Sequence, residues 1–405
     1  MTLSRRSPGK IYMPQGFSFS AACAGIKASE RLDLGLVEAA SGTTAAAVFT
    51  QNRVVAAPVE IGRAILATSH GRIRAVIVNS GNANCATGNH AYLACQQICR
   101  AAGRLLGLPS EEVFPSSTGI IGLPLPTEKI LAALATLISE RGATKKHVDL
   151  FTRAIMTTDT RPKLASVRFR SRKGTVTVLG VAKGSGMIHP QLATMLVYLF
   201  TDVAATPAEL RQLLRGACEQ TFNCISVDGD TSTNDTVLLL ASGNSGVRLN
   251  QESTRKLFAD ALSEVCQSLA QQIVSDGEGV QHVIRLSIEQ ASSQKEALQV
   301  ARAVAHSLLV KTAWAGADPN WGRILAAVGS SGVPINSDKV SIFIGSQLVC
   351  RNGASCRFDE RRAHQHLAKP VCDVRITLQR GLASTKFLTT DLTADYVRIN
   401  ADYST

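Results

Sequence analysis

The stretch Lys183-Gly-Ser-Gly-Met-Ile-His-Pro-Gln-Leu-Ala-Thr-Met-Leu196 joins a glycine-rich turn, which carries one lysine, to an apolar run that continues to Phe200. If the bond between Ala193 and Thr194 were cut, Thr194 would become an N-terminus with a hydroxyl and an amine on one residue. A free α-amino group has a pKa near ~8, so it can accept the proton of that hydroxyl and activate it as a nucleophile. Thr is also stiff about χ1, which limits where the hydroxyl can point. The stretch is therefore a candidate cleavage site with a candidate catalytic residue.

An ordinary helix is the alternative interpretation of the same residues. Pro190 suits the first position of a helix, and 191–200 would then be a buried helix with Thr194 bonded back to a carbonyl one turn earlier. On this stretch alone the helix is the simpler interpretation. The interpretation as a cleavage site with a catalytic threonine is favoured only if other stretches of the sequence agree with it.

The composition is that of a globular protein, because 45% of the 405 residues are hydrophobic and 18% are charged. This length allows a large core divided between two domains or lobes. The apolar runs are too short to span a bilayer, and no apolar segment follows the two arginines near the N-terminus. We therefore predict a cytoplasmic protein without a membrane partner.

Metal and nucleic-acid binding are both poorly supported. The ten cysteines are scattered, and no second Cys/His pair stands at the spacing of a zinc site, so we predict reduced thiols and no metal. The net charge is +12, but the basic residues are dispersed and no nucleic-acid-binding motif accompanies them. A non-catalytic protein that binds polyanions through this charge stays open as an alternative.

The pattern of apolar residues predicts both strands and helices. Strands are expected at 45–49, 74–78, 166–170, 175–179, 236–240, 282–288, 340–344 and 374–378. Helices are expected at 90–106, 128–141, 206–218, 253–274 and 293–309. They mix without a regular β-α-β order and without G-x-G-x-x-G after a strand, so we predict an α/β fold of the mixed α+β kind and disfavour a Rossmann fold.

Two turns carry groups suited to catalysis or binding. Thr118-Gly119 offers a hydroxyl beside an unhindered backbone N–H, which suits an oxyanion, although a simple turn before a helix would look the same. Glu278 stands between two glycines, where its carboxylate can reach an ammonium group or simply be exposed. The hydroxyl-rich segment 157–160 can line a site or cap a helix.

The loop Ser226-Val-Asp-Gly-Asp-Thr-Ser-Thr-Asn-Asp235 concentrates acids, amides and hydroxyls. It lacks the glycine at position six and the glutamate at position twelve of a calcium-binding EF-hand loop, so we expect a hydrogen-bonded structural loop. A metal-dependent enzyme that handles phosphate through Asp228–Asp235 is the alternative. Asp318-Pro-Asn-Trp-Gly322 is expected to be a turn packed by its tryptophan.

Together these pieces closely resemble one family, the ornithine acetyltransferases or glutamate N-acetyltransferases of arginine biosynthesis. The motifs appear in the family's order from Phe17 to the last residue. They are Ser117-Thr-Gly-Ile-Ile-Gly122, Thr157-Thr-Asp-Thr160, Ala182-Lys-Gly-Ser-Gly-Met187 with Ala193-Thr-Met-Leu196, Asp228-Gly-Asp-Thr-Ser-Thr-Asn-Asp-Thr236, Asp276-Gly-Glu-Gly279, Asp318-Pro-Asn-Trp-Gly-Arg323 and Asn400-Ala-Asp-Tyr-Ser-Thr405.

The resemblance implies a two-lobed sandwich of helices and mixed sheets, in a chain that cuts itself between Ala193 and Thr194. The products would be an α chain, 1–193, and a β chain, 194–405, assembled as an α2β2 heterotetramer. Thr194 would take the acetyl group of N2-acetylornithine and pass it to glutamate. No bound cofactor is implied, although some family members also use acetyl-CoA as a co-substrate.

The resemblance also implies the residues of the site. Thr118 and Gly119 match the oxyanion positions. The substrate-binding positions are matched by Thr157, Lys183, Thr194, Glu278, Asn400 and Thr405. The chain departs from the family pattern at two places: Gln191 stands where asparagine is usual, and Val280-Gln-His282 replaces a typical Ala-Thr-Lys.

Overall fold

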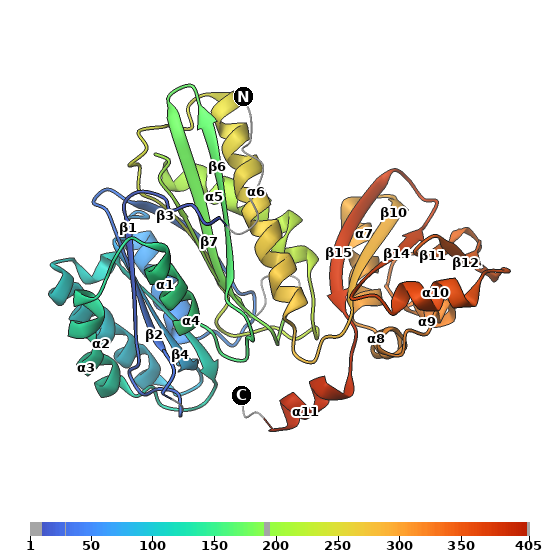
Figure 1. Ribbon diagram of the computed structural model, residues 1–405, viewed down its shortest axis with the longest axis horizontal. Coiled ribbons are helices and arrows are strands. Elements are labelled where there is room, and N and C mark those ends of the chain that lie inside the picture. The colour runs from blue at the N-terminus through green and yellow to red at the C-terminus, as the bar shows by residue number, and fades with distance from the viewer. Residues whose placement is uncertain (1–9, 29, 190–194, 403–405) are drawn as a thin grey trace.

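The computed structural model describes residues 10–28, 30–189 and 195–402, which form a larger and a smaller lobe (Figure 1). The larger lobe contains a four-stranded and a five-stranded sheet, and the smaller lobe contains a six-stranded sheet. This confirms the predicted mixed α+β class with two lobes. Ala193, Thr194 and Thr405 lie outside the described residues.

The two sheets of the larger lobe pack face to face. The four-stranded sheet has the order β1 (Phe17–Ala22), β2 (Leu34–Ala39), β4 (Ala75–Asn82) and β5 (Val113–Ile120). The five-stranded sheet has the order β3 (Thr44–Phe49), β9 (Thr236–Ala241), β8 (Leu196–Thr201), β7 (Gly174–Lys183) and β6 (Lys163–Ser171). Side chains from both sheets, among them Phe19, Val78 and Phe200, form one apolar core between them.

Helices cover the outer faces of this sandwich. The outer face of the four-stranded sheet packs on α2 (Asn89–Leu106) and α3 (Thr127–Ser139), and that of the five-stranded sheet on α5 (Pro207–Gln220) and α6 (Glu252–Ser275). The remaining helices of the lobe are α1 (Ala57–Thr68) and α4 (Lys145–Ala154). No helix among the described residues is long and apolar enough to cross a membrane.

The apolar run after Thr194 is the central strand β8, so the helix interpretation of 191–200 is wrong over its described part. Alternate side chains of a strand point to opposite faces. Tyr198 and Phe200 therefore enter the core between the sheets, while Val197 and Leu199 enter the core beneath α5 and α6. A strand buried on both faces has no side that faces water, so its polar and apolar residues do not alternate and its sequence is uniformly apolar.

The smaller lobe packs helices on its sheet of mixed direction. The strand order is β13 (Ala354–Ser355), β12 (Gln347–Arg351), β11 (Ser341–Ile344), β14 (Val371–Thr377), β10 (Val283–Ala291) and β15 (Ala383–Thr390). Only β10 and β14 are parallel among these described strands. The helices are α7 (Gln294–Ala305), α8 (Leu308–Ala315), α9 (Trp321–Gly329) and α10 (Glu360–Leu367).

The helix predicted at 293–309 is wrong at its C-terminal end. It stops at Ala305, and α8 begins at Leu308, because the Ser307 side chain accepts the N–H of Val310 and caps a new helix. The other predicted elements are present with boundaries that differ by a few residues. The strands predicted at 166–170 and 175–179 are β6 and β7, which pair as antiparallel neighbours.

The predicted division into chains 1–193 and 194–405 stays a prediction. The predicted cut would fall between β7 and β8, which are neighbours in a single sheet, and so within the larger lobe. The smaller lobe begins only after α6, and α11 (Ala394–Asp402) runs back from it toward the larger lobe (Figure 1).

Candidate active site

Lys183 lies at the end of β7, where the two sheets of the larger lobe meet. Its side chain is buried, and its ammonium donates a hydrogen bond of 3.1 Å to the hydroxyl of Thr118 on β5. Burial lowers the pKa of Lys183, while the nearby carboxylates of Asp159 and Asp235 act in the opposite direction. On the neighbouring strand, Lys183 is paired with Leu196, the second residue after Thr194 in the sequence.

Gly119 is required by a close approach of two strands. Its φ of +132° is unfavourable for any residue with a side chain, and a Cβ at this position would collide with the backbone of Gly81 on β4. The parallel pairing of β4 and β5 becomes irregular at this point. The sequence motif Thr118-Gly119 is therefore part of a strand and not the simple turn that was the alternative.

Asp159 connects the hydroxyl-rich segment to the glycine turn after Lys183. One carboxylate oxygen accepts the N–H of Gly184 at 2.7 Å and the ammonium of Lys163 at 2.6 Å, and the other accepts the N–H of Thr157 at 3.1 Å. Burial acts to raise the pKa of Asp159, but Lys183 and Lys163 outweigh it and the pKa is lowered. Segment 157–160 therefore lines the site and does not cap a helix.

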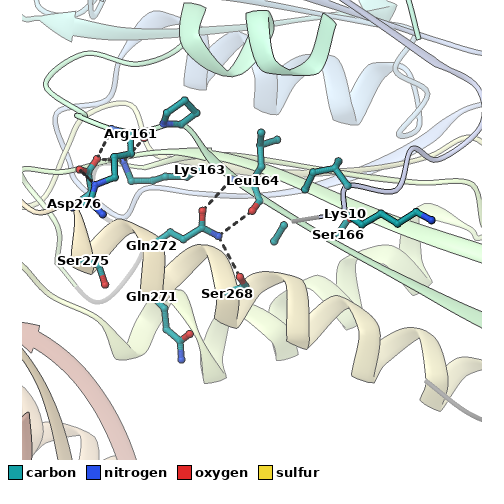
Figure 2. A pocket seen from close by; sticks show the side chains of 13 residues that line it. Lys10, Arg161, Lys163, Leu164, Ser166, Ser268, Gln271, Gln272, Ser275 and Asp276 are labelled. Carbon is teal, nitrogen blue, oxygen red and sulfur yellow. Dashed lines mark hydrogen bonds and ion pairs between the residues drawn. The ribbon is translucent and has the colours of Figure 1, made fainter. Parts of the chain in front are cut away.

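Lys163 extends this connection to the acidic turn that follows α6. Its buried ammonium also lies 2.6 Å from a carboxylate oxygen of Asp276 (Figure 2). The same oxygen accepts the N–H groups of Thr160 and Arg161. One buried lysine thus holds two buried carboxylates, as the desolvation of such charges requires. Asp276 in turn begins the turn that carries Glu278.

Glu278 lies against the glycine turn. Its N–H donates to the carbonyl of Ser185 at 3.2 Å, and its carboxylate packs so closely on Gly186 that a Cβ there would collide with it. The Asn400 amide, on α11, donates to the Glu278 carboxylate at 2.9 Å. The acid predicted to meet an ammonium group is therefore half-buried and held on two sides.

The loop 226–235 is hydrogen-bonded throughout, as expected of a structural loop. The buried amide of Asn234 donates to the carbonyls of Ala83 and Ser117, at 2.7 and 2.9 Å. Among the described residues, no three His, Cys, Asp or Glu side chains lie close enough together to hold a metal ion. The hydrogen bonds of the loop support the interpretation as a structural loop.

The structure brings most of the predicted site residues to one place. The turn 183–187 is contacted directly or through one further residue by Thr118, Gly119, Thr157, Glu278 and Asn400. The roles of Lys163 and Asp276 were missed from the sequence. The sequence did contain a signal for this role. Lys163 lies on the buried face of β6 together with Ala165, Val167 and Phe169, and a charged side chain on an apolar face needs a buried partner of opposite charge.

A cavity of about 660 Å³ lies between β6 and α6, on the side of Lys163 and Asp276 shown in Figure 2. Gln272 spans it by exchanging hydrogen bonds with both backbone groups of Leu164. None of the described residues predicted to bind substrate lines this cavity. We therefore take the cluster around the turn 183–187, and not this cavity, as the candidate active site.

Comparisons with known proteins agree on one family. The family model described as ArgJ family matches residues 18–405. The "arginine biosynthesis bifunctional protein ArgJ" of Methylococcus capsulatus is 44% identical over 96% of this chain and 95% of its own length. The "glutamate N-acetyltransferase" of Methanopyrus kandleri is 42% identical over 97% of this chain and 99% of its own length.

Among solved structures, an ornithine acetyltransferase from Mycobacterium tuberculosis in complex with ornithine is 40% identical. The match covers 44% of this chain and 92% of that one, with a TM-score of 0.41. The family model, which spans almost the whole sequence, and the two full-length relatives decide the assignment. The chain belongs to the ArgJ family.

Proposed function

We propose that this enzyme transfers the acetyl group of N2-acetylornithine to glutamate through an acetyl ester on Thr194, after cutting itself between Ala193 and Thr194. The names of its relatives support an acetyl transfer in arginine biosynthesis. The single observation that favours this site is the 3.1 Å bond from Lys183 to Thr118, next to Gly119 and opposite the strand that follows Thr194. Family membership speaks against the non-catalytic polyanion-binding alternative.

The proposed chemistry balances without a metal or a bound cofactor. Hydrolysis of the Ala193–Thr194 bond consumes one water and leaves a carboxylate on Ala193 and an amine on Thr194. That amine takes the proton of the Thr194 hydroxyl as its oxygen attacks the acetyl carbonyl, and the proton passes to the departing amine of ornithine. The amine of glutamate then attacks the ester and restores the hydroxyl.

The oxyanion formed in each step would be stabilised by the Thr118 hydroxyl and the Gly119 N–H. Because the Lys183 ammonium donates to the Thr118 oxygen, the hydroxyl hydrogen of Thr118 is left to donate to the substrate. The same ammonium is the candidate cation for the α-carboxylate that both substrates carry.

Glu278 would recognise the side-chain ammonium of ornithine, with Asn400 holding its carboxylate in place. Thr157 and Thr405 complete the proposed substrate contacts. The bifunctional names of relatives further support acetyl-CoA as a second acetyl donor. We also propose that the fragments 1–193 and 194–405 assemble as an α2β2 heterotetramer in the cytoplasm.

The direct test is intact mass spectrometry of the wild-type protein after incubation with N2-acetylornithine. We expect two fragments, of residues 1–193 and 194–405, and an increase by the mass of one acetyl group on the second. A single fragment of full length, in a preparation that releases ornithine, would contradict the proposal.

The oxyanion role of Thr118 gives a separate prediction. Thr118→Val keeps the shape of the side chain but removes the donor, so we expect kcat for ornithine release to fall about 10²–10³-fold. Steady-state kinetics with N2-acetylornithine and glutamate measure this change. Thr68→Val is the matched control, since the Thr68 hydroxyl donates to the carbonyls of Ala64 and Ile65 within α1, and it should leave kcat unchanged. A normal kcat in Thr118→Val would exclude the assigned role.

A further inference from the structure

The loop 226–235 contacts the chain on both sides of the proposed cleavage site. Before the site, the Asp228 carboxylate accepts the N–H of Met187 at 2.5 Å. After the site, the Asp235 carboxylate accepts the N–H of Met195 at 2.8 Å. These two carboxylates belong to one loop, seven positions apart by number, so the same loop holds the chain at Met187 and at Met195, on the two sides of the segment 190–194.

The end before the cleavage site is held in an unfavourable backbone conformation. Met187 has φ of +53°, which is rare for a residue with a side chain. Such a conformation persists only where the surroundings determine it. Here Asp228 binds the N–H of Met187, while the next carbonyl, that of Ile188, accepts from the N–H of Val227 at 2.9 Å and from the hydroxyl of Ser226 at 3.0 Å.

His306 orients the Ser226 hydroxyl. Because that hydroxyl donates to Ile188, it accepts from Nε2 of His306, which lies 3.1 Å away. Burial lowers the pKa of His306 to about 4, so the ring is neutral at physiological pH and carries its proton on Nε2. The ring also packs against that of His189, tilted by 31° and with 4.7 Å between centroids, and His189 directly precedes the segment 190–194.

Both acids of the loop have raised pKa values, and a carboxyl group keeps an oxygen that can accept a backbone N–H in either protonation state. Burial raises the pKa of Asp228 to about 6, so the group still binds Met187 as a carboxylate at neutral pH. Burial raises the pKa of Asp235 well above its ordinary value, and the N–H of Met195 and the charge of Lys183 oppose that rise. Asp235 is 1% exposed, and its second oxygen has no hydrogen-bond partner among the described residues.

The same loop also contacts β5, the strand that carries the proposed oxyanion pair Thr118 and Gly119. Asn234, next to Asp235, donates to the carbonyl of Ser117, and Ser117 directly precedes Thr118. The loop therefore holds three parts of the site in fixed positions relative to one another: the turn before the segment, the strand after it, and the proposed oxyanion pair.

We propose that the loop 226–235 is the positioning element of self-cleavage, with Asp228 and Asp235 as positioning residues on either side of the bond that breaks. This inference rests on the proposed cleavage between Ala193 and Thr194. A reaction within a chain becomes faster when the groups on either side of the reacting bond are held in place, as the backbones of Met187 and Met195 are by Asp228 and Asp235. It also assigns a role to the acidic loop that needs no metal ion.

A time course of cleavage tests the inference. The full chain is made by pulse-labelled cell-free translation, and the cut fraction is followed on a denaturing gel. We expect Asp228→Ala and Asp235→Ala to slow cleavage about tenfold to hundredfold, because misplacement of reacting groups has effects of this size. Asp228→Asn and Asp235→Asn keep an acceptor oxygen, so they should recover most of the wild-type rate.

Asp230→Ala is the matched control, since Asp230 is an exposed acid of the same loop whose backbone, and not its side chain, bonds to Asp228. Ser226→Ala provides a second route if an aspartate variant does not fold, and it should also slow cleavage. The inference would be wrong if the folded variants were all cut at the wild-type rate, namely Asp228→Ala, Asp235→Ala and Ser226→Ala. It would also be wrong if Asp230→Ala slowed cleavage equally. Either result would leave the proposed function standing. A wild-type chain that stays whole would overturn the proposed function, and this inference with it.

Discussion

Thr194→Ala is expected to leave the chain whole at 405 residues and to abolish acetyl transfer. Without the hydroxyl no acetyl ester can form, and without the cut no free amine is available to activate a nucleophile. Removal of a covalent nucleophile lowers kcat by about 10⁴-fold or more in enzymes of comparable mechanism. Intact mass spectrometry measures the cut, and release of ornithine from N2-acetylornithine in the presence of glutamate measures the transfer.

Thr194→Ser is the matched control for this experiment. Serine keeps the hydroxyl and loses only the methyl group that stiffens χ1, so the variant should be cut and retain measurable transfer. Alanine and serine variants with equal activity would show that the hydroxyl takes no part, and the covalent mechanism would then be wrong.

Lys163→Met is expected to destabilise the fold by about 3–5 kcal/mol, the cost of removing one partner from a buried ion pair. The lysine side chain is only 1% exposed and lies 2.6 Å from carboxylate oxygens of both Asp159 and Asp276. Methionine fills a similar volume but removes the cation that contacts both buried carboxylates. Urea unfolding, followed by far-ultraviolet circular dichroism at neutral pH, measures the change in the free energy of unfolding.

Arg161→Met is a control on the same carboxylate. Arg161 reaches Asp276 at 3.9 Å, but its side chain is 76% exposed, so water already screens the pair. An exposed ion pair contributes about 0–1 kcal/mol, and the variant should unfold close to the wild-type midpoint. A loss in Arg161→Met as large as that in Lys163→Met would show that burial does not decide the strength of these pairs.

Much of the fold could be predicted from local patterns. The strands β6 and β7 and the helix α5 were predicted from residues close together in sequence. All three are present, and α5 begins with a capping box made by Thr206 and Glu209. The stretch 191–200 could not be decided locally, because an apolar run of that length suits a buried strand or a buried helix equally well. Its neighbours β7 and β9, on either side of β8, settled the question.

The site divides in the same way. The resemblance named Thr118, Lys183 and Glu278, whereas their own short segments allowed an ordinary turn or a surface acid. Their convergence depends on Asp159 and Lys163, whose contacts join segments more than one hundred positions apart by number, such as Lys163 and Asp276. No local pattern specifies such a pair, although a lysine on the apolar phase of a strand indicates that a partner exists.

The central place of β8 has a consequence for the protein that the proposed cleavage would produce. Once the bond at 193 is broken, β7 would end one polypeptide and β8 would begin the other, while six residue pairs still join the two strands. Separating the pieces would expose the apolar interior on both faces of the strand and leave rows of backbone groups without partners. The two polypeptides would therefore unfold in a single cooperative transition, although no covalent bond of the backbone would join them.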